Sequence, residues 1–154
     1  MAARYPESVM RVVVLVGLPG SGKSTYLERM GAVGLSSDAI RRWLADDESI
    51  QTIHDRVFET LRYLLRQRLA LQRPVTYIDA TNLRPDERAP YIGIGKSYGC
   101  DVEAVFFDVP LEVCRERNRA RHRIVPEEAM AQMAARLVPP DAAEGFARIT
   151  VIGE

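Results

Sequence analysis

The stretch VVVLVGLPGSGKSTYL, from Val12 to Leu27, decides the fold of this chain. The continuous apolar run from Arg11 to Val16 predicts a parallel strand that is buried on both faces of a sheet. A glycine-rich turn follows, and Lys23 to Met30 predicts a helix that the next glycines end. The order strand, glycine-rich turn, helix is the arrangement in which a chain holds phosphate groups.

The turn matches the pattern G-x-x-x-x-G-K-[ST] at Gly17, Gly22, Lys23 and Ser24. Together with Gly20, the two motif glycines let the backbone turn sharply and approach phosphates closely, while backbone amides point at the anion. Lys23 adds a positive charge on the β and γ oxygens, and the Ser24 hydroxyl is a hard oxygen suited to Mg²⁺. The motif therefore predicts a binding site for a nucleoside triphosphate.

This phosphate cradle is compatible with kinases, ATPases and GTPases. A GTPase would need the guanine-reading pattern N-K-x-D. The only asparagines are Asn82 and Asn118, and neither precedes a lysine. GTP-specific recognition is therefore unsupported, and the remaining residues must indicate what receives the phosphate.

Strands and helices alternate along the rest of the chain, which predicts a parallel sheet with helices on both faces, an α/β fold. Further strands are expected at 33–36, 74–79, 102–109 and 147–152, and helices from Asp38, over 50–72, from Pro85, over 110–123 and over 126–137. Residues 1–10 are expected to form a loose tail, and residues 11–154 one domain.

Composition narrows the class of protein. The chain has 154 residues, a formal net charge of +0 and two cysteines, Cys100 and Cys114, in no metal or redox spacing. A neutral chain is not a protein made to coat nucleic acid, although a local basic patch remains compatible with it. Because the sequence shows no disulfide framework, signal peptide or long apolar run, we expect a cytoplasmic protein.

LSSDAIRRWL places a possible catalytic pair after the second strand. Asp38 follows that strand, and Arg41 lies one helical turn later on the same face. Since ligands bind beyond the carboxyl ends of parallel strands, Asp38 should share an edge with the phosphate cradle. It could accept the proton of an attacking hydroxyl while Arg41 holds an anion on the acceptor. A plain helix N-cap with a surface arginine is an equal alternative.

YIDATNL ends the third strand with polar residues. Asp79 could organise water around Mg²⁺ or brace the neighbouring base, and Thr81 and Asn82 could do related polar work. Capping of the loop is the favoured alternative for these residues. His54 lies beside the apolar stripe of the helix at 50–72, and we interpret it as a packed or surface histidine rather than a catalyst.

The helix PLEVCRERNRARHR carries two rows of arginines. Arg117 and Arg121 share one face, and Arg115, Arg119 and Arg123 form a row about 200° away. The first row can face the nucleotide and stabilise charge on the transferring phosphoryl group, while the other faces solvent or nearby glutamates. A solvated charged face is the simpler interpretation for three of the five arginines.

Four motifs in this order resemble the kinase module of bacterial and phage polynucleotide 5′-kinases, a branch of the P-loop phosphotransferases. They are GLPGSGKST, SSDAIRRWLADD, VTYIDATNLRPDERAPYIGIGKSYGCDVEAVFFDVP and CRERNRARHRIVP. The resemblance covers residues 11 to 152. It implies a five-stranded parallel sheet with strand order 2-3-1-4-5 and a helical lid. Family members are often fused to phosphatase or ligase modules, and none fits in this length.

The resemblance also implies roles for single residues. Asp38 is the general base on a 5′-hydroxyl, Arg41 grips the phosphate on its 3′ side, and Arg121 is the lid arginine. Asp79 stands one residue before the position where the phage enzyme carries its aspartate. The implied ATP-binding set is Gly17, Gly20, Ser21, Gly22, Lys23, Ser24, Thr25, Arg117 and Arg121, with Ser24 on Mg²⁺. The implied acceptor-binding set is Asp38, Arg41, Asp79, Thr81 and Asn82.

We therefore expect an ATP- and Mg²⁺-dependent kinase that phosphorylates the 5′-hydroxyl ends of DNA or RNA. One alternative is a P-loop kinase for a small molecule such as a nucleoside, sugar acid or antibiotic. Another, of a different class, is a regulatory module that binds a nucleotide without transferring phosphate.

Overall fold

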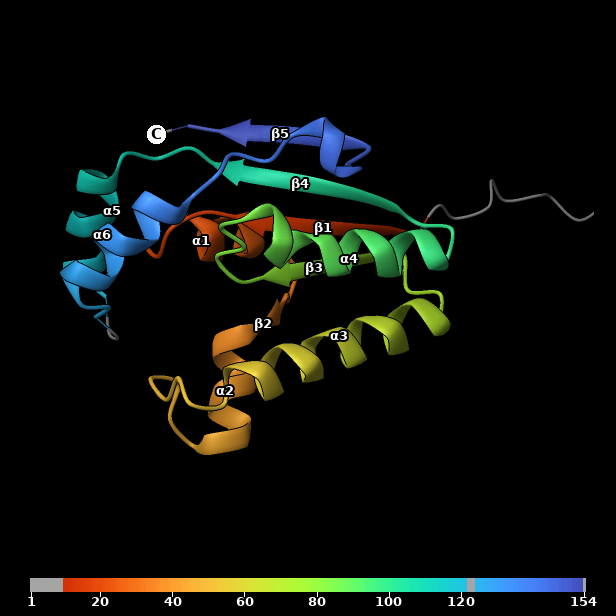
Figure 1. The fold of residues 1–154 in the computed structure, drawn as a ribbon, viewed down its shortest axis with the longest axis horizontal. Coiled ribbons are helices and arrows are strands. Elements are labelled where there is room, and N and C mark those ends of the chain that lie inside the picture. Colours follow the sequence, from red (N-terminus) through yellow and green to blue (C-terminus); the bar gives the residue numbers. More distant parts are fainter. Residues whose placement is uncertain (1–9, 122–123, 154) are drawn as a thin grey trace, which may run out of the picture.

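The structure, a computed structural model, describes residues 10–121 and 124–153. Residues 1–9 of the tail predicted at 1–10, and Arg123 of the arginine helix, lie outside the described residues, whereas Met10 packs against the core. Five parallel strands form one sheet in the order β2-β3-β1-β4-β5, so the predicted α/β fold and strand order are confirmed (Figure 1). The strands are β1 (Arg11–Val16), β2 (Leu35–Ser36), β3 (Val75–Asp79), β4 (Asp101–Phe107) and β5 (Arg148–Ile152).

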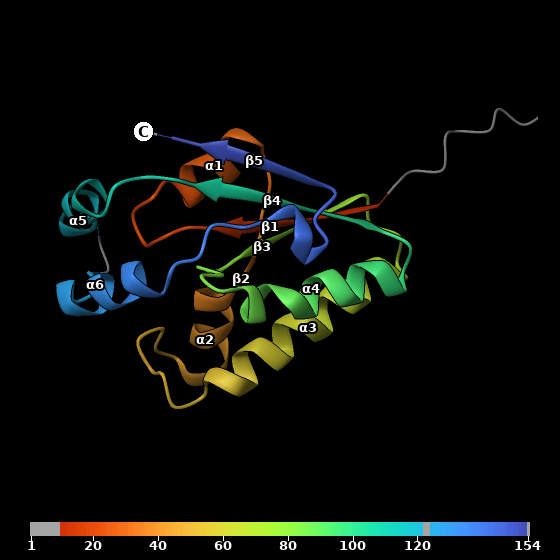
Figure 2. The same cartoon turned by 45° about the horizontal axis from the view of Figure 1, so that its top comes forward.

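Six α-helices are described alongside one short 3₁₀-helix. The α-helices are α1 (Lys23–Arg29), α2 (Ser37–Ala45), α3 (His54–Ala70), α4 (Pro85–Ser97), α5 (Leu111–Arg119) and α6 (Glu127–Arg136), and the 3₁₀-helix is η1 (Ala142–Glu144). α3 and α4 lie on one side of the sheet and α1 on the other, while α5 and α6 stand beyond the strands' carboxyl ends (Figures 1 and 2). No α-helix in the described part of the chain is long and apolar enough to cross a membrane.

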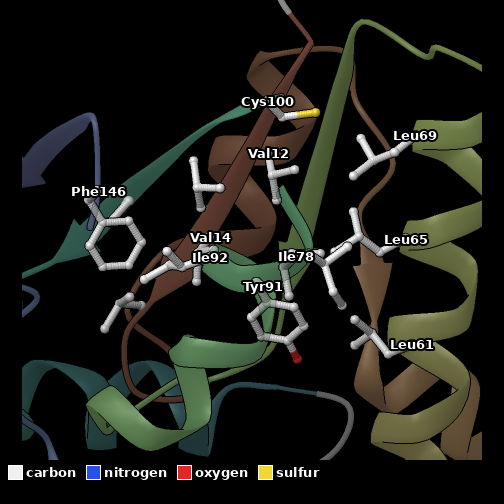
Figure 3. Packing of buried hydrophobic residues seen from close by; sticks show 14 of the residues in the cluster. Val12, Val14, Leu61, Leu65, Leu69, Ile78, Tyr91, Ile92, Cys100 and Phe146 are labelled. Atoms are coloured by element: carbon white, nitrogen blue, oxygen red, sulfur yellow. The ribbon is translucent and has the colours of Figure 1, made fainter. Parts of the chain in front are cut away.

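Successive side chains of β1 point to opposite faces of the sheet, and both sets are apolar, so helices cover both faces. Val12, Val14 and Val16 pack with Ile78 of β3 and with the buried leucines of α3, as Figure 3 shows for part of this cluster. Val13 and Leu15 face the opposite way and pack with α1 and the far side of β4. Because both faces of the central strand are buried, its unbroken apolar run in the sequence follows directly.

Several predicted boundaries shift for local reasons. The helix expected over 50–72 begins only at His54, because residues 47–51 form a turn closed by the Asp47 side chain on Ser49. The helix expected to reach residue 123 ends at Arg119. There the buried Asn118 side chain captures the backbone of Val125, with Nδ2 donating to its carbonyl at 2.7 Å and Oδ1 accepting from its amide at 3.0 Å. This exchange folds the chain back toward α6.

A fully buried arginine ties the C-terminal segment to the centre of the molecule. Arg88 of α4 is 0% exposed, and its guanidinium donates to both carboxylate oxygens of Glu144, each at 2.9 Å. Nη1 also donates to the backbone carbonyls of Asn82 and Val138. A buried guanidinium is tolerated only when it is paired and hydrogen-bonded in this way. Arg88 therefore joins α4, η1 and the loop after β3.

Candidate active site

The phosphate cradle lies between β1 and α1, at the carboxyl edge of the sheet. Gly20 and Gly22 adopt left-handed backbone angles, with φ of 81° and 109°. A Cβ on Gly20 would stand 2.7 Å from the backbone oxygen of Cys114, and one on Gly17 would stand 2.6 Å from Ser21 Oγ. The loop can therefore be closed this tightly only with glycine at these positions.

Lys23 is held by its own loop. Its Nζ donates to the carbonyl oxygens of Gly17 and Leu18, both at 2.8 Å. Although the side chain is partly accessible from the cleft, enclosure of the amine lowers the pKa of Lys23 to about 8, opposed chiefly by the charge of Asp79. A phosphate group would replace the two carbonyls as partner and favour the charged amine. The cradle thus fits a triphosphate in its loop geometry and in its charge.

Asp38 and Arg41 lie on α2 directly after β2. Ser36 caps this helix, because its hydroxyl accepts a hydrogen bond from the amide of Ala39 at 3.1 Å. The interpretation of Asp38 as the N-cap is therefore wrong: the helix begins one residue earlier, and Asp38 stands in its first turn. Its carboxylate pairs with Arg41, with Oδ1 at 3.3 Å from Nη1.

Arg41 is 5% exposed, yet it lines the same cleft as the cradle. Its Nε has no hydrogen-bond partner among the residues that the structure describes. A buried donor without a partner is costly, by about 1–3 kcal/mol, unless a bound group satisfies it. The cleft is therefore lined by a positive group beside the Asp38 carboxylate, while the Nε of that group is buried without a partner in the described part of the chain.

The residues after β3 divide between the cleft and the core. Asp79 and Thr81 line the cleft, and burial raises the pKa of Asp79, against the effect of the nearby Lys23 charge. Asn82 is buried at φ 49°, and its Nδ2 donates to the carbonyl oxygen of Leu15 at 2.7 Å. The structure thus assigns Asn82 to bracing the backbone of β1, contrary to the expected contact with an acceptor.

The arginines of α5 and of the turn after it separate into the two predicted rows. Arg117 and Arg121 line the cleft, and Arg117 Nη1 donates to the carbonyl oxygen of Gly20 at 3.4 Å. Arg115 pairs with Glu112 and Arg119 with Glu127, each at 2.7 Å. Arg121 follows the end of α5, where its charge lowers the pKa of Lys23 and opposes the rise at Asp79. The two arginines of the first row are therefore the ones placed near a donor phosphate.

One cleft of about 1640 Å³ contains both groups of residues. The donor end is lined by the cradle (Pro19–Thr25), Arg117, Arg121, Ile152 and Gly153. The acceptor end is lined by Asp38, Arg41, His54, Phe58, Asp86, Glu87, Met133 and Arg136. Asp79 and Thr81 also line this cleft, which gives a hydroxyl bound near Asp38 a path to a phosphate bound by the cradle.

The described residues contain no cluster of three or more histidines, cysteines or acidic residues that could hold a metal ion. Mg²⁺ normally keeps several waters and binds through one or two protein oxygens plus substrate phosphates. The Ser24 hydroxyl at the cleft and the carboxylate of Asp79 are oxygen donors of that kind. The site therefore fits Mg²⁺ that arrives with a nucleotide.

Two residues that support the site were missed from the sequence. Arg88 and Asn118 are both fully buried polar side chains that hold loops at the rim of the cleft. Arg88 lies with Tyr91, Ile92 and Gly95 on the buried side of α4. A charged residue within an apolar helical stripe is the sequence pattern that could have indicated its burial. No sequence pattern indicates the burial of Asn118, because it bonds to the backbone of Val125, which is the same for any residue type.

The sequence and fold of this chain are similar to those of known proteins. A protein-family model described as an AAA domain matches residues 12–140. Among solved structures, a candidate kinase from Chloroflexus aurantiacus J-10-fl has 14% identity and a TM-score of 0.72, covering 94% of this chain and 88% of that one. Kti12 from Chaetomium thermophilum, in complex with ADP-AlF3, has 17% identity and a TM-score of 0.68, covering 92% and 88%.

A gluconokinase from Sinorhizobium meliloti 1021 has 22% identity and a TM-score of 0.58, covering 94% of this chain and 83% of that one. At such identities the likeness shows the fold. The chain therefore has the P-loop kinase fold, with its cradle and cleft where that fold places them.

Proposed function

Because the chain belongs to the AAA domain family and has the P-loop kinase fold, we propose that it is an ATP-dependent kinase for the 5′-hydroxyl ends of DNA or RNA. The observation that carries this proposal is Arg41. Arg41 is 5% exposed, and its Nη1 lies 3.3 Å from Asp38 Oδ1 at the acceptor end of the cleft. A guanidinium beside the proposed base can bind an anion one phosphate away from the attacking hydroxyl.

The chain's own residues then divide the reaction between them. Asp38 accepts the proton of the 5′-hydroxyl while that oxygen forms a bond to the γ-phosphorus. The bond from the γ-phosphorus to its bridging oxygen breaks, and ADP leaves. Lys23, Arg117 and Arg121 hold the donor phosphates and stabilise the charge that develops on them. Mg²⁺, held in part by the Ser24 hydroxyl, would neutralise charge on the β and γ oxygens when bound.

The second candidate is a kinase for a small molecule, which the charge of the acceptor end favours. Asp86 and Glu87 line that end, and Arg136 is already paired with Glu87 at 3.0 Å. Arg41 is also paired, with Asp38 at 3.3 Å, so both cations assigned to this end already face a carboxylate. A long polyanion would gain little, whereas one terminal nucleotide or a small anion would fit. Solved structures of similar fold include a gluconokinase and a sugar kinase.

The test is transfer from labelled ATP to matched acceptors: 5′-hydroxyl DNA, 5′-hydroxyl RNA, a nucleoside 3′-monophosphate, the plain nucleoside and a sugar acid. We expect transfer to the oligonucleotides and to the 3′-monophosphate, and little to the plain nucleoside. Equal rates on the nucleoside and its 3′-monophosphate, or a preference for the sugar acid, would support the small-molecule kinase. Nucleotide binding without transfer to any acceptor would indicate a regulatory module.

Arg41→Ala sharpens the same test. It should raise the acceptor KM and abolish the preference for a 3′-phosphate, with the KM for ATP unchanged. Acceptor affinity should also fall gently with salt, with a log–log slope of about −1 to −2, because one or two phosphates are neutralised. A slope near −6 would require a long basic groove and would contradict this account of the acceptor end.

A further inference from the structure

The acceptor end of the cleft has an aromatic wall as well as an anion site. His54 and Phe58 stand one turn apart on α3, with ring centroids 4.7 Å apart and planes tilted by 42°. Both line the cleft. Phe58 is half-buried and packs against the core, so its ring is held in place, while His54 is exposed. The pair thus presents an aromatic surface to the cleft that the core does not cover.

The surroundings of this wall favour an uncharged occupant. Asp86 and Glu87 line the cleft, and a second cavity of about 280 Å³ behind the wall is also bordered by Asp55, Glu59 and Arg62. Arg62 and Arg136, which pairs with Glu87, offset only part of this negative charge, so a phosphate would be disfavoured there. Across the cleft α6 contributes Met133, which is partly buried against an apolar cluster. Aromatic and thioether side chains suit a flat, neutral ring.

The wall also lies close to the anion site in the fold. α2, which carries Arg41, packs against α3, and the N-terminal end of α3 lies beside α2 in both views (Figures 1 and 2). Arg41, His54 and Phe58 all line the same cleft. We propose that this pair, named here the His54–Phe58 wall, stacks a base of the acceptor and selects acceptors that carry one.

This inference rests on the proposed function, and its experiment separates the two. The acceptors are two short 5′-hydroxyl oligonucleotides that differ only in whether the 5′-terminal nucleotide carries a base or is abasic. The measurements are kcat/KM for each acceptor and equilibrium binding of each in the presence of ADP. Base stacking on aromatic side chains changes affinity by a factor of about 5 to 150, so we expect the wild-type protein to prefer the base-bearing acceptor about 10-fold.

Two variants of His54 test the wall directly, and a third variant is their control. His54→Ala should lower kcat/KM about 10-fold on the base-bearing acceptor and leave the abasic acceptor and the KM for ATP unchanged. His54→Phe keeps a ring and should restore the preference. Tyr63→Ala is the matched control, because Tyr63 is an aromatic residue of the same helix, 58% exposed, that lines neither cavity. Thermal unfolding should be similar in all three variants.

The outcomes are distinct. The stacking role of the wall would be contradicted if the wild-type protein had equal kcat/KM on the two acceptors. It would also be contradicted if His54→Ala lowered kcat/KM equally on both. Neither result would contradict the proposed function. If no phosphate is transferred to either oligonucleotide, the proposed function fails. The stacking role of the wall is then also contradicted, unless the base-bearing oligonucleotide still binds more tightly than the abasic one.

Discussion

The two ends of the cleft are built in different ways. The phosphate cradle of the donor end is made from one continuous segment, residues 17–25, whose backbone angles and carbonyls shape it. The acceptor end is assembled from side chains on α2, α3, α6 and the start of α4, four elements distant in the sequence. A phosphate group is the same in every nucleotide, so backbone can bind it. Acceptors differ, and only side chains can distinguish them.

The largest effect should come from the donor end. Lys23→Ala removes the charge at the centre of the cradle, and charges on a transferring phosphoryl group contribute about 10³–10⁵ to rate. We expect kcat to fall about 10⁴-fold with the fold retained, as measured by steady-state transfer and circular dichroism. Lys96→Ala is the control, because Lys96 is the other lysine of the chain and is exposed on α4. A folded, active Lys23→Ala protein would contradict the role of the cradle.

Asp38→Asn tests the acceptor end next. A general base contributes about 10²–10⁴ to rate, so kcat should fall about 10³-fold with little change in the KM for ATP. Ser36→Ala separates this role from helix capping, because Ser36 is the residue that caps α2. That variant should lose about 1 kcal/mol of stability and much less activity. If Asp38→Asn keeps a near-normal kcat, Asp79 becomes the next candidate for the base.

Arg121 links the two ends, since its charge acts on both Lys23 and Asp79. Arg121→Ala should lower kcat about 10²-fold, because a donor aimed at developing charge matters most in the transition state. Arg119→Ala is the matched control: Arg119 is two residues away and pairs with Glu127 at the surface. Equal effects of the two variants would assign Arg121 to the solvated row.

The smallest expected effect is the uptake of a proton by Lys23 when a nucleotide binds. The pKa of Lys23 is lowered to about 8, by burial first and Arg121 next, while Asp79, Cys114 and Asp38 oppose this. A bound phosphate favours the charged amine and raises this pKa, so nucleotide binding should take up about half a proton at pH 8. Affinity for ATP should therefore fall several-fold as the pH rises above 8. Calorimetry in buffers of different ionisation enthalpy measures the uptake, which should vanish in Lys23→Ala.

The same contrast explains what the sequence could predict. The parallel α/β sheet and the cradle follow from contiguous patterns, an apolar run on β1 and a motif at Gly17–Ser24. The strand order itself was expected from the resemblance to a known family. The spacing of Arg117 and Arg121 also sufficed, although Arg121 lies in the turn just after α5, because the two are only four residues apart. Asn82 was misjudged, since its type suggests polar chemistry in a loop, while its partner is a carbonyl 67 residues away in the chain.

The acceptor end was only partly predictable for the same reason. Asp38 and Arg41 are close in sequence, but whether Asp38 or Ser36 caps α2 depends on which residue takes the extended conformation. The contact of His54 with the cleft depends on how α3 lies beside α2, and the sequence at 50–72 shows only an apolar stripe. The cap of α2 and the position of His54 therefore depend on backbone conformation and on packing between helices, which the local sequence does not specify.

Arg88 has a consequence for how the chain folds. Its carboxylate partner, Glu144, lies 56 residues later in the chain. Removing one partner of a buried pair costs about 3–5 kcal/mol, so α4 and the loop after β3 are fully stable only once η1 has docked. The loop after β3 and the segment around η1 should therefore fold as one cooperative unit.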